Sequence, residues 1–588
     1  MYQYNSAGKL TNEWRNMVNQ LNSTDNTQIV IKFVEQLKAD LENLKQNLPV
    51  SECAYNTPRL NGKVDKQTRF THQIAYMLRP IDPTKDFESD KTNTYINCQK
   101  IISKLSHAFV DQLEKKEDEK NAYKKIRGTH ERKNFCELKK KPIHDFVLNP
   151  KPMPVDVAPI EELEPFFNHL ASNKEVLPTV SKSMIELPIV SKSMIELPIV
   201  SKSMIELPIV SKSMIEFKRG VQYSDGRMDL CKQVVGPPHI SKLMEALKDN
   251  TQITHFLLGN NIIGINGATA ISKFIEEHKN NSQIKTWYLA GNEIDAEGSK
   301  LLSDALKDDT VCEALWLKRN PIKAEGAQFI GKLMEVNKHI KILDLHNTGL
   351  LDEGTQYIME SLQKNTTLRH LYLDANGITE KGASYVADYF NYMVKHDLKG
   401  ISSLWIDMNR IDDEGMIEIT NALYGYKHLK RLIVGSNRLT DVSVGILCNT
   451  LVNSKTLKVL DLGLYKATAD IGELPNNLMN IGAEYIANFI RNNKSVEVLS
   501  VLHNNIGIEG IKLLEQALLT NDNISWLYYE QYGLDIPQTI RMSFKNKFGQ
   551  NIKKKYNMSI EDFCNHKLKY IKGSKKLKNI DSIYRNRM

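Results

Sequence analysis

The chain has 588 residues, of which 41% are hydrophobic and 25% are charged, and its formal net charge at pH 7 is +8. It is too long for one compact domain. It holds no apolar run of about eighteen residues, and its N-terminus lacks the basic start and apolar stretch of a secretory signal, so we expect neither a membrane span nor signal-peptide export. Seven scattered cysteines, none in a CxxC pair, favour a reducing, cytoplasmic setting and argue against disulfides or a metal site.

Two helical stripes are predicted in residues 1–140. Apolar side chains recur at spacings of three and four from Val30 to Leu48, and again from Cys98 to Leu113. This is the spacing of one helix face. The stripes are too short to require an intermolecular coiled coil, so the two helices are expected to pack together or on neighbours as a small α-helical domain.

Prolines crowd the segment from 141 to 176, which begins KPIHDFVLNPKPMPVDVAPIEELEP. Because proline lacks an amide proton and fixes φ, this segment is predicted to be a linker. Residues 177–216 continue as one LPTVSKSMIE and three LPIVSKSMIE decapeptides, in which each Leu-Pro pair interrupts a helix. We interpret them either as a spacer expanded by duplication or as a multivalent docking or phosphorylation segment. The serines in identical settings are Ser181, Ser191, Ser201 and Ser211.

A pattern that recurs mostly every 28 residues occupies residues 222–540. Each unit is like LRHLYLDANGIT at 368–379, in which leucine-type residues alternate with polar ones before an asparagine. The alternation predicts a short strand with one buried face, and the apolar spacing that follows predicts a helix. About eleven units are expected, the first of them degenerate, around Met228 and Leu230. The asparagine position is filled by Asn261, Asn292, Asn320, Thr348, Asn376, Asn409, Asn437, Tyr465, Asn504 and Tyr532.

The recurrent asparagine is assigned a structural role. A carboxamide both donates and accepts, so it can satisfy the backbone groups that lose their partners where a strand turns toward a helix. Losing one should cost about 1–3 kcal/mol. The predicted ladder comprises Asn261, Asn292, Asn320, Asn376, Asn409, Asn437 and Asn504. Thr348, Tyr465 and Tyr532 are expected to break it. The insertion at 467–480 is expected beside the strand ends, as a binding edge or a surface excursion.

These units resemble the leucine-rich-repeat family, and a 28-residue unit with a full helix is similar to its ribonuclease-inhibitor-like class. The resemblance implies an α/β solenoid, a horseshoe with a parallel concave sheet and outer helices. Proteins of this class include inhibitors, immune sensors and effectors that intracellular bacteria deliver into host cells. The Asn-, Lys- and Ile-rich composition and the decapeptides are similar to such effectors, which implies a virulence role in the host cytosol through a host-pathogen interaction.

The positions between the two inner leucines are predicted to face the concave side. Half of them are Trp or Tyr, and ten strands ~4.8 Å apart would make a face about 45–50 Å long. Trp, Tyr and Arg concentrate binding energy at interfaces. The predicted partner-binding residues are Tyr288, Trp316, Lys318, Arg319, Asp344, His346, Tyr372, Asp374, Trp405, Asp407 and Tyr528. The alternative is that these aromatic side chains only cover the sheet or contact the insertion.

The basic charge of the chain lies in its last segment. Residues 541–588 hold fourteen Lys or Arg and three acids, a net of +11, so the remaining residues sum to −3. We predict a solvated, partly helical tail that could contact an acidic partner or a membrane surface, and we expect no specific nucleic acid.

No Walker loop, nucleophile elbow, HExxH or kinase signature occurs, so we predict a non-enzymatic scaffold that binds a protein and takes no cofactor or small-molecule substrate. The alternatives are GTPase activation through an exposed arginine such as Arg319 and an effector enzyme in the N-terminal domain. Cys136 with His144 is a weak thiol candidate, and the sequence around Cys564 gives no support to a ubiquitin ligase.

Overall fold

The computed structural model describes residues 141–153, 156–177, 214–279, 282–573 and 579–586. The predicted helical domain at 1–140, with Cys136, and nearly all of the decapeptides at 177–216 lie outside these residues. The chain folds as two units. The early-repeat unit contains residues 149–350, 364–372 and the chain from 573 onward, and the late-repeat unit contains residues 351–363, 373–572 and the described residues before 149.

The early-repeat unit alternates strands and helices. Its strands are β1 (Met214–Glu216), β2 (Val221–Tyr223), β3 (Arg227–Asp229), β4 (His255–Leu257), β5 (Thr286–Tyr288), β6 (Ala314–Trp316), β7 (Ile342–Asp344) and β8 (His370–Tyr372). Its helices are α7 (Ile160–Ala171), α8 (Gly236–Ala246), α9 (Gly264–Glu277), α10 (Ala296–Leu306), α11 (Lys323–Val336) and the short C-terminal α21 (Ile583–Asn586). Strands β3 to β8 pair in parallel, each with the next in sequence.

The late-repeat unit continues the same alternation. Its strands are β9 (Ser403–Trp405), β10 (Arg431–Ile433), β11 (Val459–Asp461), β12 (Val498–Ser500) and β13 (Trp526–Tyr528), all parallel. Its main helices are α12 (Leu351–Leu362), α13 (Glu380–Lys395), α14 (Asp412–Ala422), α15 (Asp441–Leu451), α16 (Asn480–Asn492), α17 (Ile508–Leu519) and α18 (Gln538–Tyr556). The shorter ones are α6 (Asp145–Leu148), α19 (Ile560–Asp562), a π-helix (Phe563–Lys567) and α20 (Leu568–Lys572).

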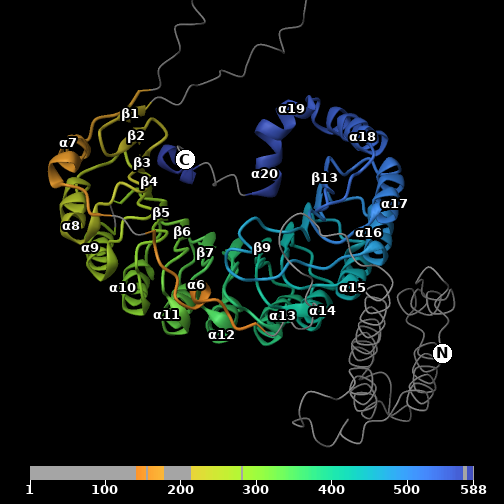
Figure 1. Ribbon diagram of the computed structural model, residues 1–588. Coiled ribbons are helices and arrows are strands. Elements are labelled where there is room, and N and C mark those ends of the chain that lie inside the picture. The colour runs from red at the N-terminus through yellow and green to blue at the C-terminus, as the bar shows by residue number, and fades with distance from the viewer. Residues whose placement is uncertain (1–140, 154–155, 178–213, 280–281, 574–578, 587–588) are drawn as a thin grey trace, which may run out of the picture. The chain divides into compact units, whose positions relative to one another are not determined.

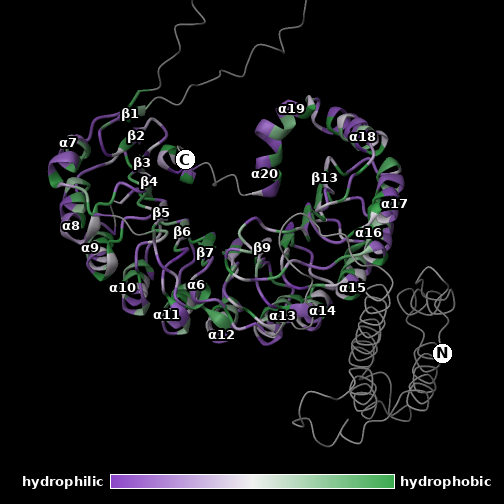
Figure 2. Ribbon diagram, in the orientation of Figure 1, coloured by the Kyte–Doolittle hydropathy of each residue, from purple (hydrophilic) through white to green (hydrophobic). Residues whose placement is uncertain are grey.

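In each unit the helices lie along one face of the strands (Figure 1). The fold follows from the repeated pattern, because the apolar residues that alternate with the concave positions point toward the helices. Leu371 and Leu373 are fully buried, as is Ile378 after the turn. Apolar and hydrophilic residues are interleaved along each helix (Figure 2), as expected where one helix stripe packs and the other meets solvent. The predicted α/β solenoid is confirmed.

The recurrent asparagines occupy the turns that follow the strands. The Asn320 carboxamide donates to the carbonyls of Leu289 (2.9 Å) and Leu317 (2.7 Å), and accepts from the amides of Asn292 (2.7 Å) and Ile294 (3.1 Å). In the late-repeat unit Asn409 accepts from Asn376 and Ile378 in the same way. Asn261, Asn292, Asn376, Asn437 and Asn504 are likewise buried and bonded to backbone groups of their own or an adjacent repeat.

The three expected interruptions of the ladder are filled in different ways. Asn476, from the insertion, takes the place expected for Tyr465: it accepts from the amide of Asn437 and donates to the carbonyls of Val434 and Leu462. Gln531, one residue before Tyr532, donates to backbone carbonyls at the last turn. Only Thr348 lacks a carboxamide, and its hydroxyl donates to Leu345. The expected breaks at Tyr465 and Tyr532 are therefore corrected, because neighbouring residues supply the amide.

A second set of asparagines, missed in the sequence, lies after the helices. Asn337 donates to the carbonyls of Leu306 and Asp309 in the preceding repeat and accepts from two amides of its own loop. The same arrangement recurs at Asn365, Asn493 and Asn521, and Asn551 of α18 donates to the loop before β13. These repeats are thus bonded to their neighbours at both ends of the helix. The recurrence of these asparagines in the sequence could have revealed them.

Both described ends of the repeat array are capped. At the start, β1 and β2 form an antiparallel pair, β2 pairs antiparallel with β3, and α7 packs on α8. Gly220 has φ +106° and lies so close to Phe166 of α7 that a side chain there would collide with the ring. At the other end, Phe544 and Phe548 of α18 stack on Tyr529 and Trp526. The basic tail is therefore partly a packed helix, which corrects the expectation of a solvated segment.

The proline-rich segment is not a free linker. In the late-repeat unit Ile143 and Val147 pack against Ala375, Met408 and Ile471. In the early-repeat unit the same segment continues over the turns: Asn149 accepts from Lys323, the amide of Met153 donates to Asn260, and that of Ala158 to Val234. We call the described residues of this segment, 141–153 and 156–158, the strap. The expectation of a linker is corrected, because the prolines leave enough apolar side chains and amides between them to bind the repeats.

Candidate protein-binding face

The sheet register places the predicted concave residues in one row in each unit. Across β3 to β8 the paired positions are Asp229, Leu257, Tyr288, Trp316, Asp344 and Tyr372. Across β9 to β13 they are Trp405, Ile433, Asp461, Ser500 and Tyr528. Because these side chains alternate with the buried leucines, they lie on the face opposite the helices.

Most of the predicted partner-binding residues are buried. Tyr288, Trp316, Asp344, Tyr372, Asp374 and Asp407 are buried, whereas Lys318, Arg319, His346, Trp405 and Tyr528 are half-buried. In the early-repeat unit the rings contact one another: Tyr288 and Trp316 have centroids 6.3 Å apart, and Trp316 and Tyr372 5.4 Å apart. Burial raises the pKa of the Asp344 carboxyl, and the nearby Lys318 opposes this shift. The row of the early-repeat unit is therefore a packed layer of aromatic side chains that also contains buried carboxyl groups.

The chain's own C-terminal segment lies on the early-repeat row. The Arg585 guanidinium is 4.6 Å from the ring centre of Tyr288 and donates to its hydroxyl at 2.7 Å. The Asp229 carboxylate accepts from the Ser582 hydroxyl (3.0 Å) and the Ile583 amide (3.1 Å). Arg227 donates to the carbonyl of Asp581. Burial raises the pKa of Asp229, while its hydrogen bonds from Cys231 and Ser582 lower it.

The segment just before it lies on the late-repeat row. The Lys572 ammonium is 4.3 Å from the ring centre of Tyr528 and 3.7 Å from the Asp461 carboxylate. Arg431, on β10, donates to the carbonyls of Ile571 (2.6 Å) and Tyr570 (3.2 Å). Burial raises the pKa of the Tyr528 hydroxyl to about 12, so this hydroxyl stays protonated at physiological pH. The prediction of an open concave wall is thus corrected at Tyr288 and Tyr528, because the tail covers them. The partner-binding role of the eleven residues stays a prediction.

Arg319, the residue proposed for GTPase activation, sits at a turn with φ +56°. The same left-handed conformation recurs immediately before the ladder residue in other repeats, at Asn260, Asn347, Ala375 and His503 among others, so it belongs to the repeat and marks no strained active site. Cys564 is half-buried, and burial raises its pKa, which disfavours the nucleophilic thiolate. In the part of the chain that the structure describes, no three His, Cys, Asp or Glu side chains are grouped to hold a metal.

The insertion folds back onto the ladder and the strap. Glu473 is fully buried and pairs with Arg410 (2.7 Å) and Arg438 (2.9 Å). Arg410 also donates to the carbonyls of Lys141 (2.7 Å) and Pro142 (2.9 Å) in the strap. Much of the insertion is therefore structural, although Tyr465 at its start is half exposed.

A family model described as "Leucine Rich repeat" matches residues 364–387. Among curated proteins, none matches the sequence. Solved structures that are similar include leiomodin-1 actin-binding site 2, at 20% identity and a TM-score of 0.25, with 29% of this chain and 91% of that chain covered. An internalin from Listeria monocytogenes matches at 16% identity and a TM-score of 0.28, with 52% and 88% covered.

The repeated strand-helix units and the asparagine ladder form a leucine-rich-repeat solenoid, and the family match lies within it. Among the residues that the structure describes, none of the helices combines the length and apolarity that crossing a bilayer requires.

Proposed function

We propose that this protein is a non-enzymatic scaffold whose concave face binds a partner protein. The observation that carries the proposal is that this face already holds a polypeptide: tail residues 570–572 and 581–585 are bound there through side chains of the concave rows. A parallel sheet face with aromatic and charged residues in register suits an extended ligand. Recognition scaffolds are also the common use of leucine-rich repeats, and protein binding needs no catalytic group.

The half-buried residues on the rows and directly after the strands are those proposed to meet the partner. Lys318, Arg319 and His346 follow strands β6 and β7, and Trp405 lies at the end of β9. These side chains retain exposed surface, as do Asp461 and Tyr528, which the tail contacts, while the other members of the rows are buried. It stays a prediction that the protein is a secreted bacterial effector and a virulence factor in the host cytosol, which the composition and the decapeptides support. Its assignment to the ribonuclease-inhibitor-like class also stays a prediction, which the length of the repeat supports.

Site-specific photo-crosslinking tests the proposal. A photo-reactive amino acid is placed at Trp405 on the concave face and, as a matched control, at Tyr424, which is 77% exposed and follows helix α14. Irradiation in cell lysate should give a discrete crosslinked protein from position 405 and none from 424. Crosslinking from 424 alone, or the same products from both positions, would contradict a concave binding face.

A further inference from the structure

The tail is held by the same three residue types in both units. In each unit an arginine at the first concave position of a strand binds tail carbonyls: Arg227 binds Asp581, and Arg431 binds Ile571 and Tyr570. In each unit a tyrosine from the row also lies under a tail cation. An aspartate of the same row, two strands away from that tyrosine, also contacts the tail. The two sets are Arg227, Asp229 and Tyr288 in the early-repeat unit, and Arg431, Asp461 and Tyr528 in the late-repeat unit.

The arginines recognise main chain. A backbone carbonyl is present in every peptide, so a guanidinium that donates to it holds an extended segment without regard to its side chains. Arg431 reaches two successive carbonyls, those of Tyr570 and Ile571. The arginine of each site therefore fixes where the main chain of a bound segment lies.

In each unit the tyrosine ring binds a tail cation; Asp461 also contacts that cation, whereas Asp229 accepts from the tail residues just before it. The face of a phenol ring attracts ammonium and guanidinium groups, and a carboxylate beside it adds charge and hydrogen-bond acceptors. Arg585 uses both the ring and the hydroxyl of Tyr288, while Lys572 contacts the ring of Tyr528 and the carboxylate of Asp461. This part of each site selects lysine or arginine in the ligand.

The contact between tail and rows is mainly polar. Of the tail residues at the two sites, the buried apolar ones are Ile571 and Ile580, while the remaining contacts are hydrogen bonds and cations on rings. A contact of this kind lacks the large apolar core of an obligate interface, so it can be exchanged for a competing segment that makes the same bonds.

We propose that each set is a recognition site for an extended segment of a partner protein that carries an exposed arginine or lysine, and that the chain's own tail occupies the sites until such a segment displaces it. The inference rests on the proposed function, since it names the chemistry of the partner bound by the same face. It assigns Tyr288 with Asp229, and Tyr528 with Asp461, as the specificity-determining pairs.

The experiment uses the full chain and a fluorescein-labelled peptide of residues 579–586, NIDSIYRN, with affinity measured by fluorescence anisotropy. In the wild-type chain the tail competes with the peptide. In the Arg585→Ala chain the competing cation is gone, so the peptide should bind at least about tenfold more tightly, a change worth about 1.4 kcal/mol. Arg541→Ala is the matched control, because Arg541 lies in the tail on α18 and its Nε donates to Ile536, away from the rows. It should behave like wild type.

Three further arms test specificity. Adding Tyr288→Ala to the Arg585→Ala chain should abolish the gain, and Tyr288→Phe, which keeps the ring and loses only the hydroxyl, should reduce it. A peptide with Arg585→Ala should bind neither chain, whereas one with Arg585→Lys should keep part of the affinity. An excess of unlabelled wild-type peptide should raise hydrogen exchange at residues 581–585 of the wild-type chain, because it displaces them.

Equal affinity of the peptide for the wild-type and Arg585→Ala chains would overturn the inference. The inference would also be overturned if Tyr288→Phe left the affinity of the peptide unchanged and the Arg585→Ala peptide bound as tightly as the wild-type peptide. This outcome does not depend on whether the Tyr288→Ala chain folds. If the peptide arms fail while crosslinking from position 405 succeeds, the proposed function stands and the partner chemistry is wrong. If the peptide binds but position 405 captures nothing, the sites serve the tail alone and displacement by a partner is refuted.

Discussion

At the scale of single residues, most turns after the strands use a carboxamide, but it need not come from an asparagine at the regular position of the repeat. Asn320 makes four hydrogen bonds to two repeats, which a hydroxyl or an aromatic ring cannot reproduce. Where the regular position holds Tyr465, the chain extends by an insertion until Asn476 reaches the same place. The insertion is therefore explained at least in part by the backbone groups that it satisfies.

The residue-scale prediction concerns Asn476. Asn476→Ala leaves the amides of Asn437 and Leu439 and the carbonyls of Val434 and Leu462 without the bonds that the carboxamide makes. Because unsatisfied buried backbone groups are costly, the free energy of unfolding should fall by about 1–3 kcal/mol, measured by urea denaturation. Tyr465→Ala, in the same segment but half exposed, should change it by less than about 0.5 kcal/mol. A larger loss from Tyr465→Ala than from Asn476→Ala would restore Tyr465 as the ladder residue.

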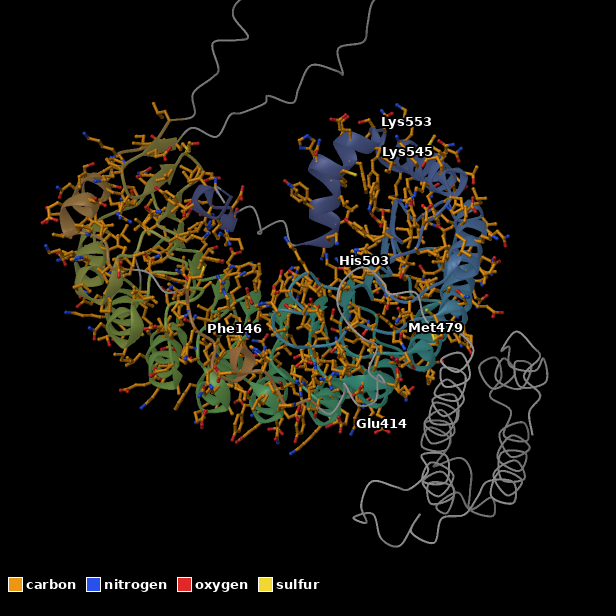
Figure 3. The ribbon with its side chains drawn as sticks, viewed as in Figure 1. Phe146, Glu414, Met479, His503, Lys545 and Lys553 are labelled. Carbon is orange, nitrogen blue, oxygen red and sulfur yellow. The ribbon has the colours of Figure 1, made fainter. Side chains whose placement is uncertain are left out.

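At the scale of elements, the strap shows that prolines do not prevent a segment from docking. In its helix α6, Val147 is buried against the repeats and Phe146, labelled in Figure 3, is exposed. Arg410 fixes the start of the strap through two carbonyls, and Glu473 holds Arg410 in turn. The negative Glu473 is shared between two buried guanidinium groups, and burial lowers the pKa of Arg438, an effect that the neighbouring Glu473 opposes.

The element-scale prediction tests this network. Glu473→Gln keeps the volume of the side chain but leaves Arg410 and Arg438 as buried cations without their shared carboxylate, so it should lower the free energy of unfolding by about 3 kcal/mol or more. Hydrogen exchange at Val147 and Leu148 should rise as the strap loosens. Asp470→Asn removes an exposed charge from the same insertion and should leave both measurements unchanged. Unaltered exchange in Glu473→Gln would mean that the strap is held independently of Arg410.

At the scale of the whole molecule, most features that repeat along the chain could be predicted from the sequence, although the asparagines after the helices were missed. The strands, the helices, the ladder and the concave rows recur mostly every 28 residues, because each repeat packs chiefly on its neighbours. Contacts between distant segments have no period to reveal them. Arg585 binds Tyr288, and Lys141 binds Arg410, across more than 250 residues. For this reason the residues of the rows could be predicted from the sequence, but their coverage by the tail, the docking of the strap and the caps could not.

The caps matter because the last repeat of an array has no successor to cover it. Helix α18 does this for β13 with its apolar side, whereas Lys545 and Lys553 remain exposed on its other side (Figure 3). Two lysines of the same helix, Lys547 and Lys554, bind Asp522 at 2.8 Å and lower the pKa of its carboxyl to about 2. Part of the tail's positive charge is thus neutralised within the chain, and the docked helix covers the last repeat.

Replacing Phe544 by alanine tests the requirement for this cap. Phe544 is buried and stacks on Tyr529 with ring centres 4.1 Å apart, so its loss leaves a cavity under α18 and should lower the free energy of unfolding by about 3–5 kcal/mol. Because stability in a repeat array is passed between neighbours, hydrogen exchange should rise most in β13 and α17 and least in β9. Met542→Ala changes an exposed residue of the same helix and should leave exchange at β13 as in wild type. A uniform rise from β9 to β13 in Phe544→Ala would show that the late repeats unfold as one block and that α18 is no local cap.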